Sequence, residues 1–241
     1  MENKAFEIKS IKRIIDSKET EKLVECVSGM ELQDIPIGEG DNAFILIPKE
    51  KSFERVCIKK VKQNPLIKIN EIDKECELQA EARKMTHKKD EGNYFSVPQT
   101  LLSFTTKDGE MYLVMERVDG YSIEEILKNP KLLPEKFDYQ VFCKDLDERT
   151  FLLHGKSTGE GIHHRDLHIG NVMINMEGLP VFIDFGAAIK GSGSEETYNL
   201  AGSGALRYDP QLKRYMDYNK HLDTDLVMIE KLKEKLRSLI A

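Results

Sequence analysis

The feature that most constrains this chain is a polar segment followed by two short apolar runs and a second polar segment. The segment 163–171 reads HHRDLHIGN, the apolar runs are 172–174 and 181–183, and the segment 184–186 reads DFG. Two such runs around the turn 176–178 predict a β-hairpin that Asn171 enters and Asp184 leaves. Both side chains offer the hard oxygen ligands that Mg²⁺ prefers. An Asp after a strand can also be an ordinary turn residue, so the rest of the chain has to decide.

Two further signals lie upstream, between short apolar runs. The segment 37–45 reads IGEGDNAFI, and the apolar run 56–58 ends at Lys59. Glycines such as Gly38 and Gly40 let the backbone approach a phosphate closely with its N–H groups available as donors. Taken alone, a glycine pair of this kind is more often a plain hairpin turn, and a strand lysine is more often a solvated side chain.

The order of these signals is more specific than any one of them. Glycine turn, strand lysine, H-R-D-L-x-x-x-N and D-F-G together resemble the signature set of the protein kinase superfamily, from about residue 31 to residue 225. The resemblance implies an α+β, bilobal protein-kinase-like fold with a small antiparallel-sheet N-lobe and a shortened, mainly helical C-lobe. We expect a helical N-terminal extension (1–30), an N-lobe (31–118) and a truncated C-lobe (119–241).

Local patterns agree with this division. The spacing of Ile8, Ile11, Leu23 and Val27 predicts helix within 1–30. Five strands are expected at 32–37, 44–47, 55–59, 101–104 and 111–115, with one inserted helix at 70–85. Helices are predicted again at 122–127, 137–153 and 223–240. The first of these begins with a capping-box pattern, S-x-x-E, at Ser122.

The resemblance implies a role for each polar signal residue. Lys59 would neutralise the nucleotide α- and β-phosphates, and a helix glutamate would pair with it. Glu81 fits that glutamate best, and Glu77, one turn earlier, is the alternative. Asp166 would orient the acceptor hydroxyl and take its proton. The expected magnesium ligands are Asn171 and Asp184.

The resemblance also places residues around the nucleotide base. With the glycine turn and the lysine, the expected nucleotide-binding residues are Gly38, Gly40, Ile45, Cys57, Lys59, Met115, Glu116, Val118 and Met173. Met115 would gate the back pocket, the backbones of Glu116 and Val118 would meet adenine, and Ile45, Cys57 and Met173 would sandwich the ring. Ordinary core packing is the alternative for the three apolar positions.

The identity of the acceptor is less clear from these motifs. Arg165 before Asp166 is typical of protein kinases whose activation loop is ordered by a phosphate, and the loop offers hydroxyls at Ser192, Ser194, Thr197, Tyr198 and Ser203. His168, however, stands where protein kinases usually carry lysine, and D-L-H-x-G-N is similar to aminoglycoside and other small-molecule phosphotransferases. Either Asp223 or Asp225 resembles the aspartate that opens the central C-lobe helix.

These features predict an ATP- and Mg²⁺-dependent phosphotransferase, first a protein serine/threonine kinase capable of autophosphorylation. The alternative is a kinase of small alcohols. A pseudokinase scaffold is disfavoured because Lys59, Asp166, Asn171 and Asp184 are all present. The predicted partners are ATP and a protein or small-alcohol substrate, and a regulatory protein could complete the shortened C-lobe.

Composition excludes several other classes. The net charge of −6 gives no support for nucleic-acid binding. The 4 cysteines form no C-x-x-C pair, which favours free thiols in a reducing compartment. No apolar run reaches the roughly 18 to 20 residues of a membrane-spanning helix, and the first residues lack the apolar stretch of a secretory signal. We therefore expect a cytoplasmic protein, in its own cell or in a host cell.

Overall fold

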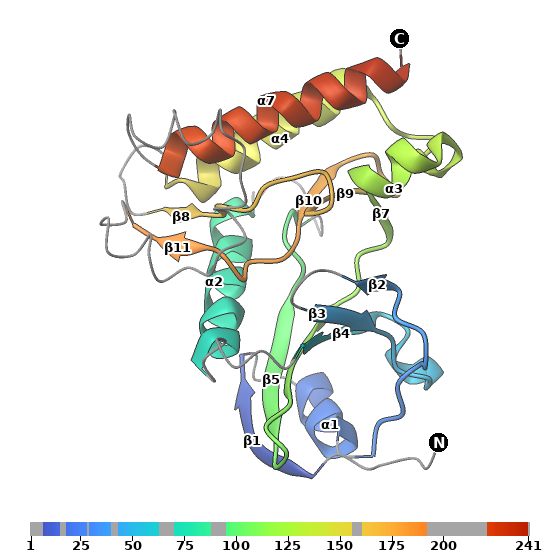
Figure 1. The fold of residues 1–241 in the computed structure, drawn as a ribbon, viewed down its shortest axis with the longest axis vertical. Helices are drawn as coiled ribbons and strands as arrows, with labels where there is room; N and C mark the ends of the chain where they lie inside the picture. Colours follow the sequence, from blue (N-terminus) through green and yellow to red (C-terminus); the bar gives the residue numbers. More distant parts are fainter. Residues whose placement is uncertain are drawn as a thin grey trace. The chain divides into compact units, whose positions relative to one another are not determined.

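The computed structural model describes residues 7–14, 18–27, 29–39, 43–62, 70–87, 95–155, 161–191 and 221–240 (Figure 1). The chain divides into two compact units. One comprises Met1–Ala80 and Pro98–Arg117, and the other comprises Glu81–Val97 and Val118–Ala241. The α+β fold class, with one unit built on an antiparallel sheet and the other largely helical, is confirmed.

The strands are β1 (Ile8–Arg13), β2 (Gly38–Glu39), β3 (Ala43–Leu46), β4 (Val56–Val61), β5 (Thr100–Thr106), β6 (Met111–Glu116), β7 (Gly120–Ser122), β8 (Ile162–His163), β9 (Val172–Asn175), β10 (Pro180–Phe182) and β11 (Ile189–Lys190). The α-helices are α1 (Lys18–Val27), α2 (Asn70–Thr86), α3 (Ile123–Lys128), α4 (Tyr139–Leu153) and α7 (His221–Ile240). Two 3₁₀ turns are η1 (Lys51–Phe53) and η2 (Pro130–Leu132).

The first unit is a six-stranded sheet in the order β1-β5-β6-β4-β3-β2, and every neighbouring pair is antiparallel. Its central strand β6 is buried along almost its whole length because a helix packs on each face of the sheet. Side chains alternate between the two faces along a strand. Tyr112 and Val114 therefore join one cluster, while Met111, Leu113 and Met115 join the other.

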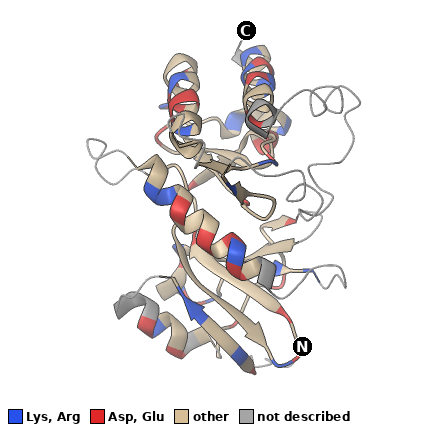
Figure 2. Ribbon diagram, turned by 90° about the vertical axis from the view of Figure 1, so that its left-hand side faces the viewer, with Lys and Arg blue, Asp and Glu red and all other residues tan. Residues whose placement is uncertain are grey.

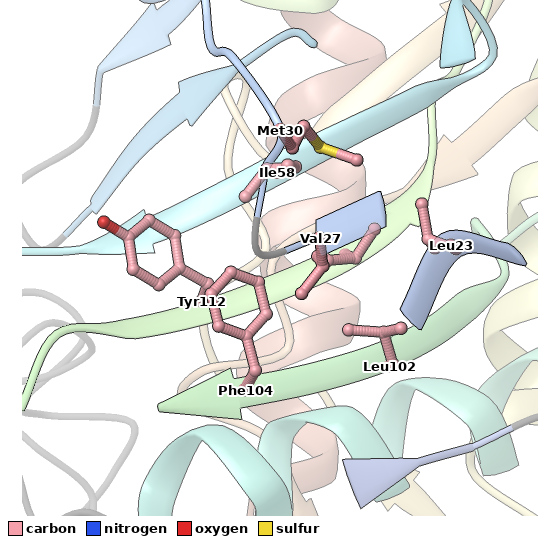
Figure 3. Close-up of a cluster of buried hydrophobic side chains, with 8 residues drawn as sticks. Leu23, Val27, Met30, Ile58, Leu102, Phe104 and Tyr112 are labelled. Carbon is pink, nitrogen blue, oxygen red and sulfur yellow. The ribbon is translucent and has the colours of Figure 1, made fainter. Parts of the chain in front are cut away.

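Helix α1 covers the first face (Figure 3). Leu23 and Val27 of α1, with Met30 just after it, pack against the apolar side chains of β4, β5 and β6. Phe104 and Tyr112 stack there with ring centroids 4.7 Å apart. A fully buried aliphatic side chain contributes roughly 1.5–3 kcal/mol, so α1 is bound firmly to the sheet.

Helix α2 covers the opposite face. Ile72 and Cys76 of α2 pack with Cys57 and Val61 of β4 and with the second set of β6 side chains. Residues 57, 59 and 61 of β4 share a face, so this packing also directs Lys59 towards α2. The sheet thus determines which helix supplies the partner of the lysine.

The expectation of a helical extension at 1–30 is wrong for its first part. Residues 8–13 form the edge strand β1, paired with β5, and only Lys18–Val27 is helical. The spacing of Ile8 and Ile11 suggested a helix, but a register shift between Ile8 and Ser10 inserts one extra residue into the strand. With that bulge, a spacing of three keeps both isoleucines on one face. Strand β1 and α1 are therefore part of the sheet unit rather than an appendage.

Most other predicted elements are confirmed within a residue or two, with one exception in the sheet. The strand expected at 32–37 is reduced to an isolated bridge between Leu32 and Pro48, and the short strand β2 follows it at Gly38–Glu39. The predicted helix at 122–127 is α3, and its capping box is present. Ser122 Oγ accepts from the Glu125 amide, and the Glu125 carboxylate accepts from the Ser122 amide.

The second unit contains two small sheets and the helices α3, α4 and α7. The sheets have the orders β10-β9-β7 and β11-β8. Acidic and basic residues are interspersed along the helices rather than separated by sign (Figure 2). Among the described residues, the helices are all too short or too polar to cross a membrane.

Candidate active site

Lys59 projects from β4 into a buried ion pair with α2. Its Nζ lies 2.7 Å from Glu75 Oε1, and the two side chains are only 7 % exposed each. A buried ammonium requires a charged partner because removing one member leaves the other charge uncompensated. The pair therefore holds Lys59 in one place and fixes the rotation of α2 about its axis.

The expected partner of Lys59, Glu81, is incorrect, and so is the alternative, Glu77. Glu81 pairs with Lys190 of β11 at 2.7 Å, and Glu77 pairs with Lys12 of β1 at 2.7 Å. Both pairs are at least partly exposed. Glu81 was expected because the apolar Met85 follows it at helical spacing. Glu81 lies six residues after Glu75, and at 3.6 residues per turn this rotates its side chain two-thirds of a turn away from the face of α2 that meets β4.

A sequence signal for Glu75 did exist. The buried residues of α2 recur at helical spacing, and they are Ile72, Glu75, Cys76, Leu78, Gln79, Ala82 and Thr86. Within the described side chains of α2, Glu75 is the acidic residue on this stripe. An acidic residue inside an apolar stripe requires a buried partner, which is the rule that would have identified it.

The residues expected around the base lie mainly on the same sheet. Cys57 Sγ donates to the Glu116 carbonyl at 3.7 Å, and the Glu116 amide donates to the Gln99 carbonyl at 2.8 Å. Burial raises the pKa of Cys57 to about 12, so the thiol stays protonated. Met115 is buried, and its sulfur accepts from Gln79 Nε2 at 3.6 Å.

The glycine turn is only partly described. Gly38 lies in β2 opposite Ile45 of β3, and a Cβ at Gly38 would meet Ile45 at an ordinary 3.6 Å. Packing against the described residues therefore does not require a glycine there. Gly40 lies outside the described residues. In the second unit, Val118 and Met173 are partly exposed, and Met173 of β9 faces away from the buried Val172 and Ile174.

The loop between β8 and β9, which contains the H-R-D-L-x-x-x-N segment, is anchored by Asp225 of α7. Its carboxylate accepts from the backbone amides of His164 (2.8 Å) and Arg165 (2.9 Å), and it lies 3.1 Å from His154 Nε2. Burial by itself would raise the pKa of Asp225, but the hydrogen bond from His154 and the nearby His164 and His154 lower it overall. The anchoring aspartate is therefore Asp225, and the Asp223 side chain lies outside the described part of the structure.

This anchor holds the loop in an unusual backbone conformation. Arg165 has a φ of 65°, in the left-handed region that residues with a Cβ seldom adopt. The His164 ring lies 4.8 Å from the Phe185 ring, and its Nε2 is 3.0 Å from the Ile183 carbonyl. Loop, hairpin and α7 are thereby tied together.

Asp166, Asn171 and Asp184 come together at the end of the β9–β10 hairpin. Asn171 Nδ2 donates to Asp166 Oδ2 at 3.1 Å and to the Asp166 carbonyl at 2.9 Å. The Ile183 amide donates to the Asn171 carbonyl at 3.0 Å, which places Asp184 next to this pair. Asp184 has a φ of 64°, and its Oδ1 accepts from the Gly186 amide at 3.2 Å.

The electrostatics of this cluster favour a cation. Burial raises the pKa of Asp166, and the charge of Asp184 raises it further, against the opposing effects of His168, His164 and the Asn171 hydrogen bond. The Asp184 carboxylate and the Asn171 amide oxygen are ligands that suit a divalent hard cation, whose charge would also relieve the repulsion between Asp166 and Asp184. The activation-loop hydroxyls, 192–203, lie outside the described residues.

Comparisons with known proteins agree with this arrangement. A family model described as protein kinase domain matches residues 33–224. The probable serine/threonine-protein kinase mkcD of Dictyostelium discoideum is 30 % identical over 111 residues, covering 46 % of this chain and 16 % of that protein. Mitogen-activated protein kinase kinase 2 of Arabidopsis thaliana is 32 % identical over 81 residues, covering 34 % and 21 %.

A bacterial protein is similar to the same degree. The probable serine/threonine-protein kinase PknB of Bifidobacterium longum is 33 % identical over 98 residues, covering 40 % of this chain and 14 % of that protein. The matched part of the chain thus spans only 14 to 21 % of the length of these relatives. The family model covers most of the chain and includes Lys59, Glu75, Asp166, Asn171 and Asp184, and on the ground of its coverage the chain belongs to the protein kinase family.

Proposed function

We propose that this chain is an ATP- and Mg²⁺-dependent protein kinase that phosphorylates serine or threonine hydroxyls. The observation that carries the proposal is the cluster of Asp166, Asn171 and Asp184 at one hairpin end, with Lys59 held by Glu75 in the sheet unit. Support also comes from the family membership and from relatives that are named serine/threonine kinases. The proposal requires both sets of residues to serve one nucleotide.

Each residue has a role that suits its chemistry. Asp166 accepts the proton of the acceptor hydroxyl, and Asn171 holds its carboxylate through Oδ2. Lys59, kept charged and oriented by Glu75, neutralises the nucleotide phosphates. Asn171 and Asp184 would hold Mg²⁺, whose charge, when bound, stabilises the transferring phosphoryl group.

Regulation and location are further parts of the proposal. Autophosphorylation would fall on the loop 191–203, which phosphosite mapping by mass spectrometry can test. The thiols of Cys57, Cys76 and Cys143 are free, which suits the reducing environment of a cytoplasm.

A second candidate, transfer to a small alcohol, is favoured by one observation. His168 lies two residues after Asp166 in the sequence, and its Nε2 is 3.8 Å from Asp166 Oδ2. An imidazole there differs in charge and length from the lysine expected of a protein kinase. The acceptor must therefore be determined directly.

The test is transfer of labelled phosphate from ATP, with Mg²⁺, to generic protein substrates and in parallel to a panel of aminoglycosides and sugars. We expect transfer to protein and none to the alcohols. Asp166→Asn should retain nucleotide binding, measured by equilibrium titration, and lose transfer by at least about 100-fold. Labelled small alcohols alone would select the second candidate, and full activity of the variant would remove Asp166 from the mechanism.

A further inference from the structure

The segment from Asp166 to Asn171 contains a contact that the proposed reaction has not used. The Gly170 amide donates to His168 Nδ1 at 3.0 Å. A backbone N–H can only donate, so Nδ1 is the acceptor nitrogen of the ring. The neutral imidazole therefore carries its proton on Nε2.

That protonated nitrogen is directed to the catalytic carboxylate. His168 Nε2 lies 3.8 Å from Asp166 Oδ2, and Asn171 Nδ2 donates to the same oxygen at 3.1 Å. The His168 contact is longer than a hydrogen bond, as catalytic contacts often are before substrate binds. Among the described residues, the Asn171 hydrogen bond and the nearby His168 Nε2 both lie at Oδ2, which leaves Oδ1 as the oxygen for the acceptor hydroxyl.

Gly170 is required by this arrangement for space rather than for backbone conformation. Its φ is not among the positive values of the described residues. A Cβ on Gly170 would lie 2.9 Å from His168 Cε1 and 3.1 Å from Nδ1, and 3.2 Å from Glu124 Oε2. Real Cβ atoms rarely approach a neighbour so closely, so His168 and Gly170 form one packed unit.

The segment that contains His168 and Gly170 is held in place by helix α3. The Glu124 amide, at the start of α3, donates to the Ile169 carbonyl at 2.8 Å. The Glu124 carboxylate bonds Lys128 at 2.7 Å. Gly170 thus has the His168 ring and the Glu124 carboxylate as neighbours, and its own amide sets the orientation of that ring.

From these contacts we infer that His168 is a positioning residue for Asp166. Its ring, held by the Gly170 amide as the Nε2–H tautomer, donates to Asp166 Oδ2 and thereby presents Asp166 Oδ1 to the acceptor hydroxyl. The inference rests on the proposed phosphotransfer for its effect on rate. The tautomer and its dependence on Gly170 can be measured without any turnover.

The first arm of the test is kinetic. His168→Phe removes the donor, and His168→Gln retains an N–H near the position of Nε2. We expect kcat to fall about 10- to 100-fold in His168→Phe with the KM for ATP unchanged, and to recover largely in His168→Gln. Gly170→Ala keeps the imidazole but displaces it, and should reproduce the loss in kcat. Glu177→Gln, at an exposed ion pair with Lys136, is the surface control.

The second arm is ¹⁵N NMR of the histidine side chains near pH 8.5, where an imidazole of ordinary pKa is neutral. The His168 resonances, assigned from their loss in His168→Phe, should show an unprotonated Nδ1 and a protonated Nε2. In Gly170→Ala the ring should become a mixture of tautomers. A protonated Nδ1, or spectra unaffected by Gly170→Ala, would overturn the inference.

The two arms separate failure of the inference from failure of the proposed function. If the protein is active and His168→Phe keeps its kcat, His168 does not position Asp166. If the wild type transfers phosphate to no acceptor, the proposed function fails, and the NMR result alone decides whether the ring is held as inferred. Thermal unfolding and amide spectra of each variant verify that it is folded.

Discussion

At the scale of the residue, the site depends on side chains whose charge is compensated inside the protein. The pair of Lys59 with Glu75 is buried, whereas the pair of Glu81 with Lys190 is much more exposed. An exposed pair contributes about 0–1 kcal/mol, and loss of a buried partner has a far larger effect. The structure therefore distinguishes two glutamates of the same helix by their burial and by the lysine that each one contacts.

This distinction gives a matched pair of variants. Glu75→Gln should lower kcat/KM for phosphate transfer about 100-fold, because Lys59 then lacks its charged partner. Glu81→Gln should change kcat/KM less than about 3-fold. Both are measured by steady-state transfer to the acceptor identified above. A larger loss in Glu81→Gln than in Glu75→Gln would mean that α2 turns a different face to β4 in the working protein.

At the scale of the element, strand β1 and helix α1 complete the sheet unit. Strand β1 extends the sheet beyond β5, and α1 covers the face opposite α2. The two faces of β6 are buried only because both helices are present. The N-terminal segment is thus expected to contribute to stability rather than to recruit a partner.

The contribution of α1 can be measured with two neighbouring residues. Leu23 is 2 % exposed within the cluster of Figure 3, and Lys22 is exposed. Leu23→Ala should lower the free energy of unfolding by about 2–5 kcal/mol. Lys22→Ala should change it by less than about 0.5 kcal/mol. Equilibrium urea unfolding followed by circular dichroism makes the comparison, and equal effects would show that α1 does not pack on the sheet.

At the scale of the whole molecule, we expect the buried His163 to link stability to pH. His163 of β8 lies 4.8 Å, ring to ring, from His154 of α4, which contacts Asp225 of α7. Burial lowers the pKa of His163, nearby His154 and Arg165 lower it further, and Asp225 opposes them. The three side chains have spacing that suits a metal ion, but the Asp225 oxygens already accept backbone amides, so we assign them to anchoring.

The sign of the pH effect follows from the lowered pKa. As the pH falls below about 6.5, His163 becomes protonated in the unfolded chain before it does so in the folded chain. The unfolded state then binds more protons, so the free energy of unfolding decreases as the pH falls. We expect the melting temperature to fall between pH 7.5 and pH 5, and to fall less in His163→Leu. The pKa of Asp225 is lowered, so this carboxyl does not titrate between pH 7.5 and pH 5 and does not contribute to the change. An identical decline in both proteins would contradict the assignment.

The sequence by itself determined the family and the α+β class, and it predicted Lys59, Asp166, Asn171 and Asp184 as the polar residues of the site. These conclusions follow from the order and the types of neighbouring residues. A hairpin between Asn171 and the D-F-G segment 184–186 can be recognised without knowing how distant parts of the chain pack. The capping box at Ser122 was likewise readable because both of its partners lie within one turn.

Tertiary structure alone decided which residues meet across the chain. Whether Glu75, Glu77 or Glu81 bonds Lys59 depends on the rotation of α2, which packing of Ile72 and Cys76 on the sheet sets. Whether residues 8–13 form helix or strand depends on the free edge that β5 offers for pairing. The bulge in β1 changes the alternation of inward and outward side chains, so the sequence pattern does not indicate a strand. Asp225 became the loop anchor because α7 carries it to backbone amides about 60 residues earlier in the chain, a contact that no local pattern encodes.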